Sequence, residues 1–127
     1  MPGFVTDFRQ LEVYREAEEV AERIFQLSKR FPRDEYYSLS NQFNRASRSI
    51  GAQIAEAWAR RRYPRHFVAK LSDADAEQLE TRHWLHVAVN CGYVDSKEAN
   101  NLAAQLDKIG RQLNVMMQKA DHFRIHD

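Results

Sequence analysis

Apolar residues recur at alternating intervals of three and four positions through the last quarter of the sequence. This heptad spacing places every apolar side chain on one face of an α-helix. Such a face must be covered by other helices, because an isolated helix would leave it in water. The face consists of Ala99, Leu102, Leu106, Ile109, Leu113, Met116, Ala120 and Phe123. The sequence therefore predicts a helix that begins after Asp95 or Ser96 and belongs to a helical bundle.

The beginning of the sequence predicts another amphipathic helix. It spans residues 7–31, with Asp7 as a candidate N-cap and Pro32 as the residue that ends it. Its apolar stripe is predicted to contain Leu11, Tyr14, Ala17 or Glu18, Ala21, Phe25 and Ser28, widened by Val13, Val20 and Leu27.

Two more helices are predicted in the middle of the sequence. One begins near Ser38 or Ser40 and ends before Pro64, and the next spans residues 64–91 with Gly92 as its C′ residue. Pro64 suits the first turn of a helix, where its missing N–H is not needed. The predicted core face of the earlier helix comprises Leu39, Phe43, Ala46, Ile50, Ile54 and Ala57.

Four helices joined by short links are expected to be antiparallel neighbours. The sequence has only four glycines and three prolines, which disfavours the many turns of a β-fold, and no strand pattern or repeat competes. The predicted fold class is all-α, an antiparallel up-down four-helix bundle. A length of 127 residues fits one domain over residues 1–127.

The sequence carries no signal for export or for a membrane. Its start, MPGFVTDFRQ, has neither the basic nor the apolar region of a signal peptide. No apolar run approaches the ~18 residues that a membrane span needs. The single cysteine, Cys91, cannot form an internal disulfide and is expected to be a small buried residue. We therefore expect a cytoplasmic protein that has no membrane partner.

Positive charge is concentrated in the middle of the sequence. Residues 36–70 hold seven Lys or Arg and one Asp or Glu, although the net charge of the whole chain is +1. In one interpretation, these cations complement a helix C-terminus and pair with acidic residues of the first helix. In the other, they bind an anionic partner, foremost the phosphates of RNA or single-stranded DNA. The candidate nucleic-acid-binding residues are Arg45, Arg48, Arg60, Arg61, Arg62, Arg65 and Lys70.

Aromatic and acidic residues bear on the choice between these interpretations. Trp58 and Tyr63 lie among the arginines and are candidates for stacking on unpaired bases, although such residues more often belong to a core or an interface. The carboxylates available for local pairing are Glu16, Glu18, Glu19 and Glu22.

The side of the second predicted helix opposite its core face carries small residues where polar ones are usual. Ala52, Ala55 and Ala59 project there. Alanine is a good helix former, so simple solvent exposure is one explanation. A helix that is apolar or small on both sides is usually buried on both sides, which is the other explanation. We therefore expect these alanines to form an oligomer interface, with solvent exposure as the alternative.

One set of residues matches a known sequence pattern over nearly the whole chain. The pattern is F-x-x-L, then F-P-x-x-E-x-Y-x-L-x-x-Q-x-x-R-A-x-x-S-I-x-x-N-I-A-E-G, then E-L-E-T. Gln53, Ala57 and Gln78 depart from it. The matching residues are Phe8, Leu11, Phe31, Pro32, Glu35, Tyr37, Leu39, Gln42, Arg45, Ala46, Ser49, Ile50, Ile54, Ala55, Glu56, Leu79, Glu80 and Thr81. The chain thus resembles the four-helix-bundle intervening-sequence proteins, named for reading frames inserted in large-subunit ribosomal RNA genes.

This resemblance implies properties that the residues alone do not. It implies a cytosolic four-helix bundle, often a ring-shaped homopentamer, without catalytic residues. Similar proteins act as accessory factors of reverse transcriptases in diversity-generating retroelements and bind nucleic acid through a basic surface. The resemblance therefore implies that the chain's partners include further copies of itself, a nucleic acid and a reverse transcriptase.

The segment EQLETRHWLH is the strongest candidate for a metal site. Glu80 and His83 form an E-x-x-H pair, the ligand spacing of carboxylate-bridged di-iron bundles. The second such pair that this site needs is missing from the sequence, so we expect no metal, no cofactor and no catalytic residue. The predicted function is that of a non-enzymatic oligomeric bundle that binds RNA or single-stranded DNA. A protein-interaction scaffold is the alternative, and a di-metal enzyme is a more distant one.

Overall fold

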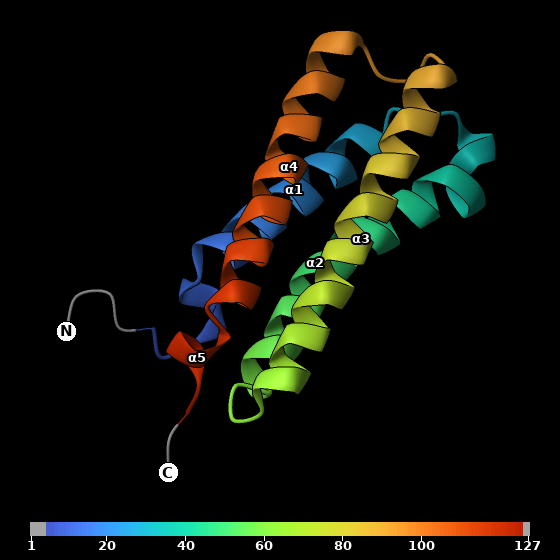
Figure 1. The fold of residues 1–127 in the computed structure, drawn as a ribbon. Helices are drawn as coiled ribbons and strands as arrows, with labels where there is room; N and C mark the ends of the chain where they lie inside the picture. The colour runs from blue at the N-terminus through green and yellow to red at the C-terminus, as the bar shows by residue number, and fades with distance from the viewer. Residues whose placement is uncertain (1–4, 126–127) are drawn as a thin grey trace.

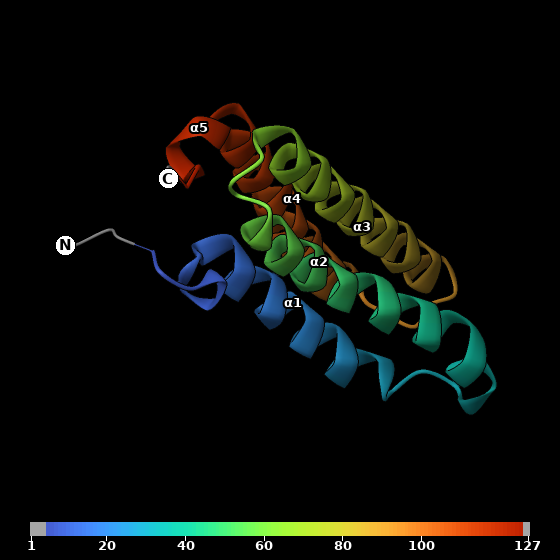
Figure 2. The same ribbon diagram turned by 90° about the horizontal axis from the view of Figure 1, so that it is seen from below.

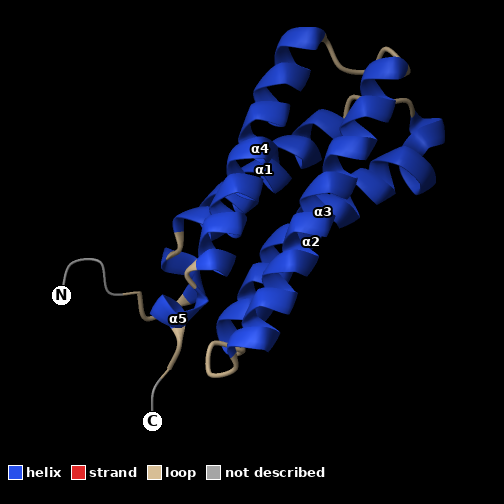
Figure 3. Cartoon of the chain, viewed as in Figure 1, coloured by secondary structure: helices blue, strands red, loops and turns tan. Residues whose placement is uncertain are grey.

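Four long antiparallel helices, joined by short links, form the molecule (Figure 1). The computed structural model describes residues 5–125, and its elements are helical throughout (Figure 3). The long helices are α1 (Glu12–Ser28), α2 (Asn41–Ala59), α3 (Pro64–Asn90) and α4 (Ser96–Gln118). Viewed from below, they follow one another around the bundle in chain order (Figure 2). The all-α, antiparallel up-down four-helix bundle predicted from the sequence is confirmed.

The predicted first helix is divided into two elements. A single 3₁₀ turn, η1 (Phe8–Gln10), is closed by a capping box in which Asp7 accepts from the Arg9 N–H. Leu11 then adopts an extended backbone, with φ −67° and ψ 131°, so α1 begins only at Glu12. The prediction of one helix over residues 7–31 was therefore wrong at its start, and α1 also ends earlier than predicted, at Ser28. The capping box satisfies the orphan N–H groups of the short turn locally, which lets the chain change direction before α1.

The link between α1 and α2 is more structured than the sequence indicates. After a 3₁₀ turn, η2 (Arg33–Glu35), a π-helical turn, η3 (Tyr36–Ser40), leads directly into α2. The Glu35 carboxylate accepts hydrogen bonds from Ser38 Oγ at 2.7 Å and from Tyr93 Oη at 2.9 Å. These two bonds lower the pKa of Glu35 below its usual range. The bond from Tyr93 also ties this turn to the link between α3 and α4.

The predicted signals at the ends of α3 and α4 are confirmed. Pro64 occupies the first turn of α3, and Gly92 follows the helix with φ +78°, which a residue with a side chain rarely adopts. Asp95 caps α4 by accepting from the Glu98 N–H at 2.8 Å. The heptad pattern continues past the end of α4, because a separate short helix, α5 (Ala120–Phe123), carries its last two positions.

The buried core follows the predicted heptad face of α4 and the predicted core face of α2. In α1 the predicted stripe was partly wrong: Val13, Val20 and Leu27 are buried as predicted, but Ile24 was missed. Ile24 is fully buried, whereas Tyr14, Ala21 and Phe25 are half-buried and Glu18 is exposed. The buried row is Val13, Ala17, Val20, Ile24 and Leu27. Cys91 was also predicted wrongly, because it is exposed just beyond the last packed turn of α3.

No helix within residues 5–125 has the length and apolar character needed to cross a membrane.

Replacing Gly51 by alanine should stabilise the protein. Gly51 lies inside α2, and a Cβ there would meet its nearest neighbour, Tyr14 Cε1, at 3.4 Å. Alanine loses less backbone entropy in a helix than glycine, so we expect the free energy of unfolding to rise by about 0.5–1 kcal/mol. Urea unfolding measures this difference.

The matched comparison is Gly110→Ala in α4. A Cβ at Gly110 would lie 3.0 Å from Gln78 Nε2 of a buried side chain, so the gain should be smaller or absent. A G51A protein that is less stable than the wild type would contradict the space that the structure assigns to Gly51.

Candidate nucleic-acid interface

Four arginines gather at the turn between α2 and α3. The last residue of α2 is Ala59, and the chain turns through hydrogen bonds from the Arg60 N–H to the Ala57 carbonyl and from the Tyr63 N–H to the Arg60 carbonyl, both 2.9 Å. Pro64 then starts α3. This turn lies at the lower end of the bundle in Figure 1. We call it the arginine turn and define it by Arg60, Arg61, Arg62 and Arg65.

One arginine of the turn is held against the bundle. The Arg61 guanidinium carbon lies 3.6 Å from the centroid of the Trp58 ring, and Arg61 Nε donates to the Trp58 carbonyl at 2.8 Å. Desolvation lowers the pKa of Arg61, but an arginine remains charged at neutral pH. Trp58 is only 9% exposed, so its ring serves the core and the Arg61 contact. It is therefore not a free surface on which a base can stack.

The other residues of the turn face solvent. Tyr63 is 55% exposed, and its ring lies 5.6 Å from that of His66. Arg60, Arg62 and Arg65 are exposed. Within residues 5–125, the side chains of Arg60 and Arg65 make no hydrogen bond or ion pair. The turn therefore presents at least two positive charges that the described part of the chain does not neutralise.

Three of the four acidic residues of α1 that the sequence offers as partners bond elsewhere. Glu16 pairs with Lys108 of α4 at 2.9 Å. Glu19 accepts from Gln105, and Glu22 accepts from Gln26. The local pairing that the sequence left open is thus not formed between these three carboxylates and Arg60, Arg61 or Arg65.

Two predicted nucleic-acid-binding residues have carboxylate partners within the bundle. Arg45 bonds to Glu80 and lies 3.6 Å from Glu77. A hydrogen bond from Trp84 Nε1 at 3.1 Å, reinforced by Arg45, lowers the pKa of Glu80. Lys70, close to the arginine turn in sequence, lies 3.6 Å from Glu56 and 3.8 Å from Asp73.

Arg48 lies away from the arginine turn, near the start of α2. Its guanidinium carbon is 5.1 Å from the centroid of the Phe25 ring in α1. The structure therefore brings together four of the seven predicted residues and distributes Arg45, Arg48 and Lys70 along the bundle.

The alanines of the predicted oligomer interface lie on the outer side of α2. In the single chain, Ala52 and Ala59 are exposed and Ala55 is half-buried. α2 packs against α1 on one side and α3 on the other (Figure 2), and Ala52 borders a hollow that residues of α1, including Tyr14 and Glu18, also line. The placement agrees with the helical projection from the sequence.

The segment EQLETRHWLH serves the packing of α3. Thr81 is fully buried and donates to the Glu77 carbonyl at 2.8 Å, and Glu80 is bonded to Arg45 and Trp84. Within residues 5–125, no three His, Cys, Asp or Glu side chains come together as metal ligands would. Glu80 therefore acts as a partner of Arg45 in this structure.

Sequence reasoning missed a hollow of about 760 Å³ where α1 ends and α2 begins. Its walls include Phe25, Lys29, Arg33, Tyr36 and Tyr37. The signal available in the sequence was the succession of cations and aromatic residues in KRFPRDEYY. Two adjacent tyrosines in a link between helices have no position in the core pattern of either helix.

Comparison with known proteins gives a matching family and matching solved structures. The model of the 23S rRNA-intervening sequence protein family matches residues 9–115. A crystal structure from Bacteroides thetaiotaomicron, of a protein with unknown function from the S23 ribosomal protein family, is 27% identical with a TM-score of 0.75. The match covers 84% of this chain and 95% of that one. No curated protein matches. The chain belongs to the 23S rRNA-intervening sequence protein family.

Proposed function

We propose that this protein is a non-enzymatic, self-associating helical bundle that binds RNA or single-stranded DNA through the arginine turn. The observation that carries the proposal is the exposure of Arg60 and Arg65 without a partner among residues 5–125. Like charges held together in one turn repel, and an anionic ligand removes this repulsion.

The chemistry of the turn suits the phosphates and bases of a single strand. An arginine guanidinium donates two parallel hydrogen bonds to a phosphate, and the exposed ring of Tyr63 supplies a face on which an unpaired base can stack. Neither contact reads a base edge. Binding should therefore depend strongly on salt and weakly on sequence.

Self-association would place several copies of this weak site in one assembly. One turn supplies at most a few phosphate contacts, so a single chain should bind poorly. An assembly through the alanine face of Ala52, Ala55 and Ala59 would repeat the arginine turn, and linked sites bind far more tightly than one site. The alternative function is a protein-interaction scaffold in which the arginines pair with carboxylates of a neighbouring copy. The Arg45 contacts with Glu77 and Glu80 show that this chain uses such pairs between its own helices.

The double variant Arg60→Ala, Arg65→Ala tests the proposal. We expect the affinity for a labelled single-stranded RNA to fall about tenfold or more, because charge-assisted hydrogen bonds to phosphate are lost. The dependence of log K on log salt should flatten by about 0.7 for each phosphate contact removed. Fluorescence anisotropy over a series of salt concentrations measures both quantities.

The control is Arg111→Ala, Lys119→Ala, which removes one cation that pairs with Asp107 at 3.3 Å and one exposed cation directly after α4. The control should keep the wild-type affinity and salt dependence. Equal losses of RNA affinity in both double variants would mean that binding depends on the net charge of the protein, and would contradict a site at the arginine turn. Undetectable binding by the wild type would favour the scaffold.

A further inference from the structure

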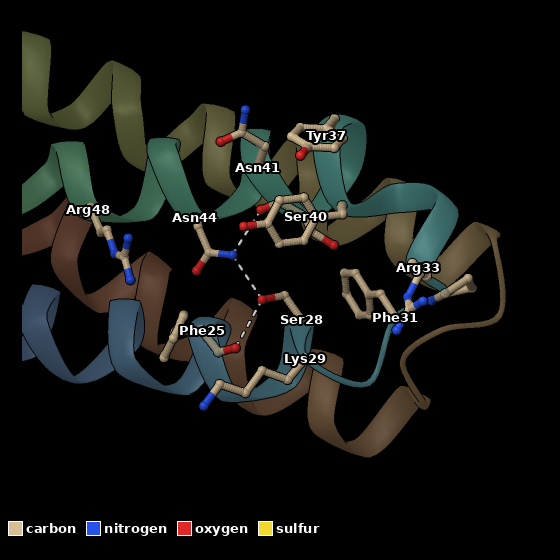
Figure 4. A pocket seen from close by; sticks show the side chains of 12 residues that line it. Phe25, Ser28, Lys29, Phe31, Arg33, Tyr37, Ser40, Asn41, Asn44 and Arg48 are labelled. Atoms are coloured by element: carbon tan, nitrogen blue, oxygen red, sulfur yellow. Dashed lines mark hydrogen bonds between the residues drawn. The ribbon is translucent and has the colours of Figure 1, made fainter.

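The hollow of about 760 Å³ lies at the opposite end of α2 from the arginine turn (Figure 4). It is formed by residues of α1, the following link, the π-helical turn η3 and the start of α2. We call it the aromatic hollow. Its lining residues are Phe25, Ser28, Lys29, Phe31, Pro32, Arg33, Tyr36, Tyr37, Ser40, Asn41, Asn44 and Arg48.

The aromatic hollow carries positive charge only. Lys29, Arg33 and Arg48 line it and are exposed, and its lining contains no carboxylate. Within residues 5–125, none of these three cations forms an ion pair. The carboxylate of Glu35 in the adjoining link is hydrogen-bonded elsewhere. Binding surfaces are complementary in charge, so a ligand of this hollow is expected to be negatively charged.

The three cations are separate points of contact. Lys29 Nζ lies 4.5 Å and the Arg48 guanidinium carbon 5.1 Å from the centroid of the Phe25 ring, and Figure 4 shows this ring between the two cations. Arg33 lies in the link, at the other end of the hollow from Arg48 (Figure 4). A ligand that neutralises these cations therefore needs several negative groups that are spaced along the hollow.

Open aromatic side chains lie next to the cations. Tyr36 is 64% and Tyr37 86% exposed, and their ring centroids are 4.8 Å apart in an edge-to-face arrangement. Aromatic rings that are this exposed contribute little to a core and are typical of surfaces that bind a partner. The ligand is therefore expected to bring an apolar side chain to these rings as well as negative charge.

The distance along the hollow suits a short extended peptide. Tyr37 and Arg48 are eleven residues apart on the continuous helix of η3 and α2, which corresponds to about 16 Å. An extended peptide advances about 3.3 Å per residue, so about five residues span this distance. Between the two positions, Asn41 is exposed, and its side chain makes no hydrogen bond within residues 5–125. Its amide is therefore available to bond to the backbone of a peptide.

From these observations we infer that the aromatic hollow binds a short acidic segment of another protein in an extended conformation. Different carboxylates of the segment pair with Lys29, Arg33 and Arg48, and an apolar side chain packs against Tyr37. Acidic and apolar residues can follow one another in such a segment, which matches walls where cations and aromatic rings lie side by side. This site is separate from the arginine turn and does not depend on the function proposed for it.

Phage display of random peptides about seven residues long, long enough to span the hollow, tests the chemistry of the ligand on the full chain. We expect the selected peptides to be enriched in Asp and Glu over Lys and Arg and to contain an aromatic or aliphatic residue. Fluorescence anisotropy of the strongest selected peptide then measures its affinity. This affinity should fall as salt is added, because salt screens exposed ion pairs.

The double variant Lys29→Ala, Arg48→Ala tests the charged part of the hollow. We expect its affinity for the strongest selected peptide to fall about tenfold or more, because two ion pairs are lost. Both cations are exposed and form no ion pair within residues 5–125, so the fold does not depend on them. The double variant Arg60→Ala, Arg65→Ala should bind the peptide as the wild type does, because its cations belong to the arginine turn.

The variant Tyr37→Ala tests the aromatic part. Tyr37 lies outside the core, so the variant should fold as the wild type does. Its affinity for the peptide should fall about tenfold, as is typical when an aromatic contact of an interface is removed. Tyr63→Ala is the matched control, because Tyr63 is an exposed tyrosine beyond the other end of α2. This control should keep the wild-type affinity for the peptide.

Four results would overturn the inference. The first is a selection that yields no peptides, or peptides without acidic enrichment. The second is unchanged peptide affinity in both Lys29→Ala, Arg48→Ala and Tyr37→Ala. The third is loss of peptide binding in Arg60→Ala, Arg65→Ala, which would place the peptide at the arginine turn. The fourth is that the two variants of the hollow dissociate an assembly in light scattering and keep their affinity for the peptide, which would make the hollow a contact between copies.

Discussion

Replacing Ala52 by glutamate is expected to convert an assembly of several copies into single chains. Ala52 is exposed in the single chain, so the substitution leaves the fold intact. In an assembly that packs through the alanine face, a charged side chain at this position would keep the backbones apart and bury an unpaired charge. Light scattering after gel filtration should give the mass of one chain, whereas the wild type should give a multiple of it.

The same substitution should also weaken the binding of nucleic acid. Loss of linked sites typically reduces avidity by 10²–10⁴, so single-stranded RNA should bind Ala52→Glu at least 100-fold more weakly. Ala104→Glu is the matched control, because Ala104 is an exposed alanine on α4 away from the alanine face. A wild type that is monomeric at micromolar concentration would contradict the interface, and so would an Ala52→Glu protein that keeps the wild-type mass.

Leu106→Ala should cause the largest loss of stability. Leu106 is fully buried in the heptad face of α4, and removing its side chain leaves a cavity that the four helices cannot collapse fully. Such substitutions cost about 2–5 kcal/mol of the free energy of unfolding. That is a large share of the 5–15 kcal/mol typical of a whole domain.

The control for Leu106→Ala is Val115→Ala in the same helix. Val115 is 46% exposed and lies off the heptad face, so its truncation should cost less than about 1 kcal/mol. Urea unfolding of the three proteins gives the comparison. Equal losses at the two positions would contradict the assignment of the heptad face as the buried side of α4.

The fold was predictable because apolar periodicity marked the core faces of α2 and α4, and proline, glycine and Asp95 marked ends of the helices. In α4 the apolar residues form one face at heptad spacing, so the buried residues of this helix could be predicted directly from the spacing. In α1 apolar side chains occupy two adjacent rows, and only packing against α2 and α4 selects the row of Ile24 over that of Phe25. The break at Leu11 arises from the capping box of Asp7 and Gln10, which competes with a continuous helix.

The candidate site was predictable only in part, because charged side chains form ion pairs with residues that are distant in sequence. Arg45 and Glu80 are 35 residues apart, and their contact depends on how α2 and α3 face one another. The clustering in the arginine turn could be predicted, because its four arginines are close together in the sequence. The hollow of about 760 Å³ was missed because its walls combine residues of α1 and α2 with a link and a π-helical turn, and the link and the turn have no repeating pattern.

Photo-crosslinking tests the central claim most directly. A single-stranded RNA that contains 4-thiouridine is bound to the wild-type protein, irradiated and digested, and the attached peptide is identified by mass spectrometry. Binding through the arginine turn predicts attachment at Tyr63 or elsewhere within residues 58–67, and a strong reduction in Arg60→Ala, Arg65→Ala. Attachment only outside this segment, or none at all, would contradict it.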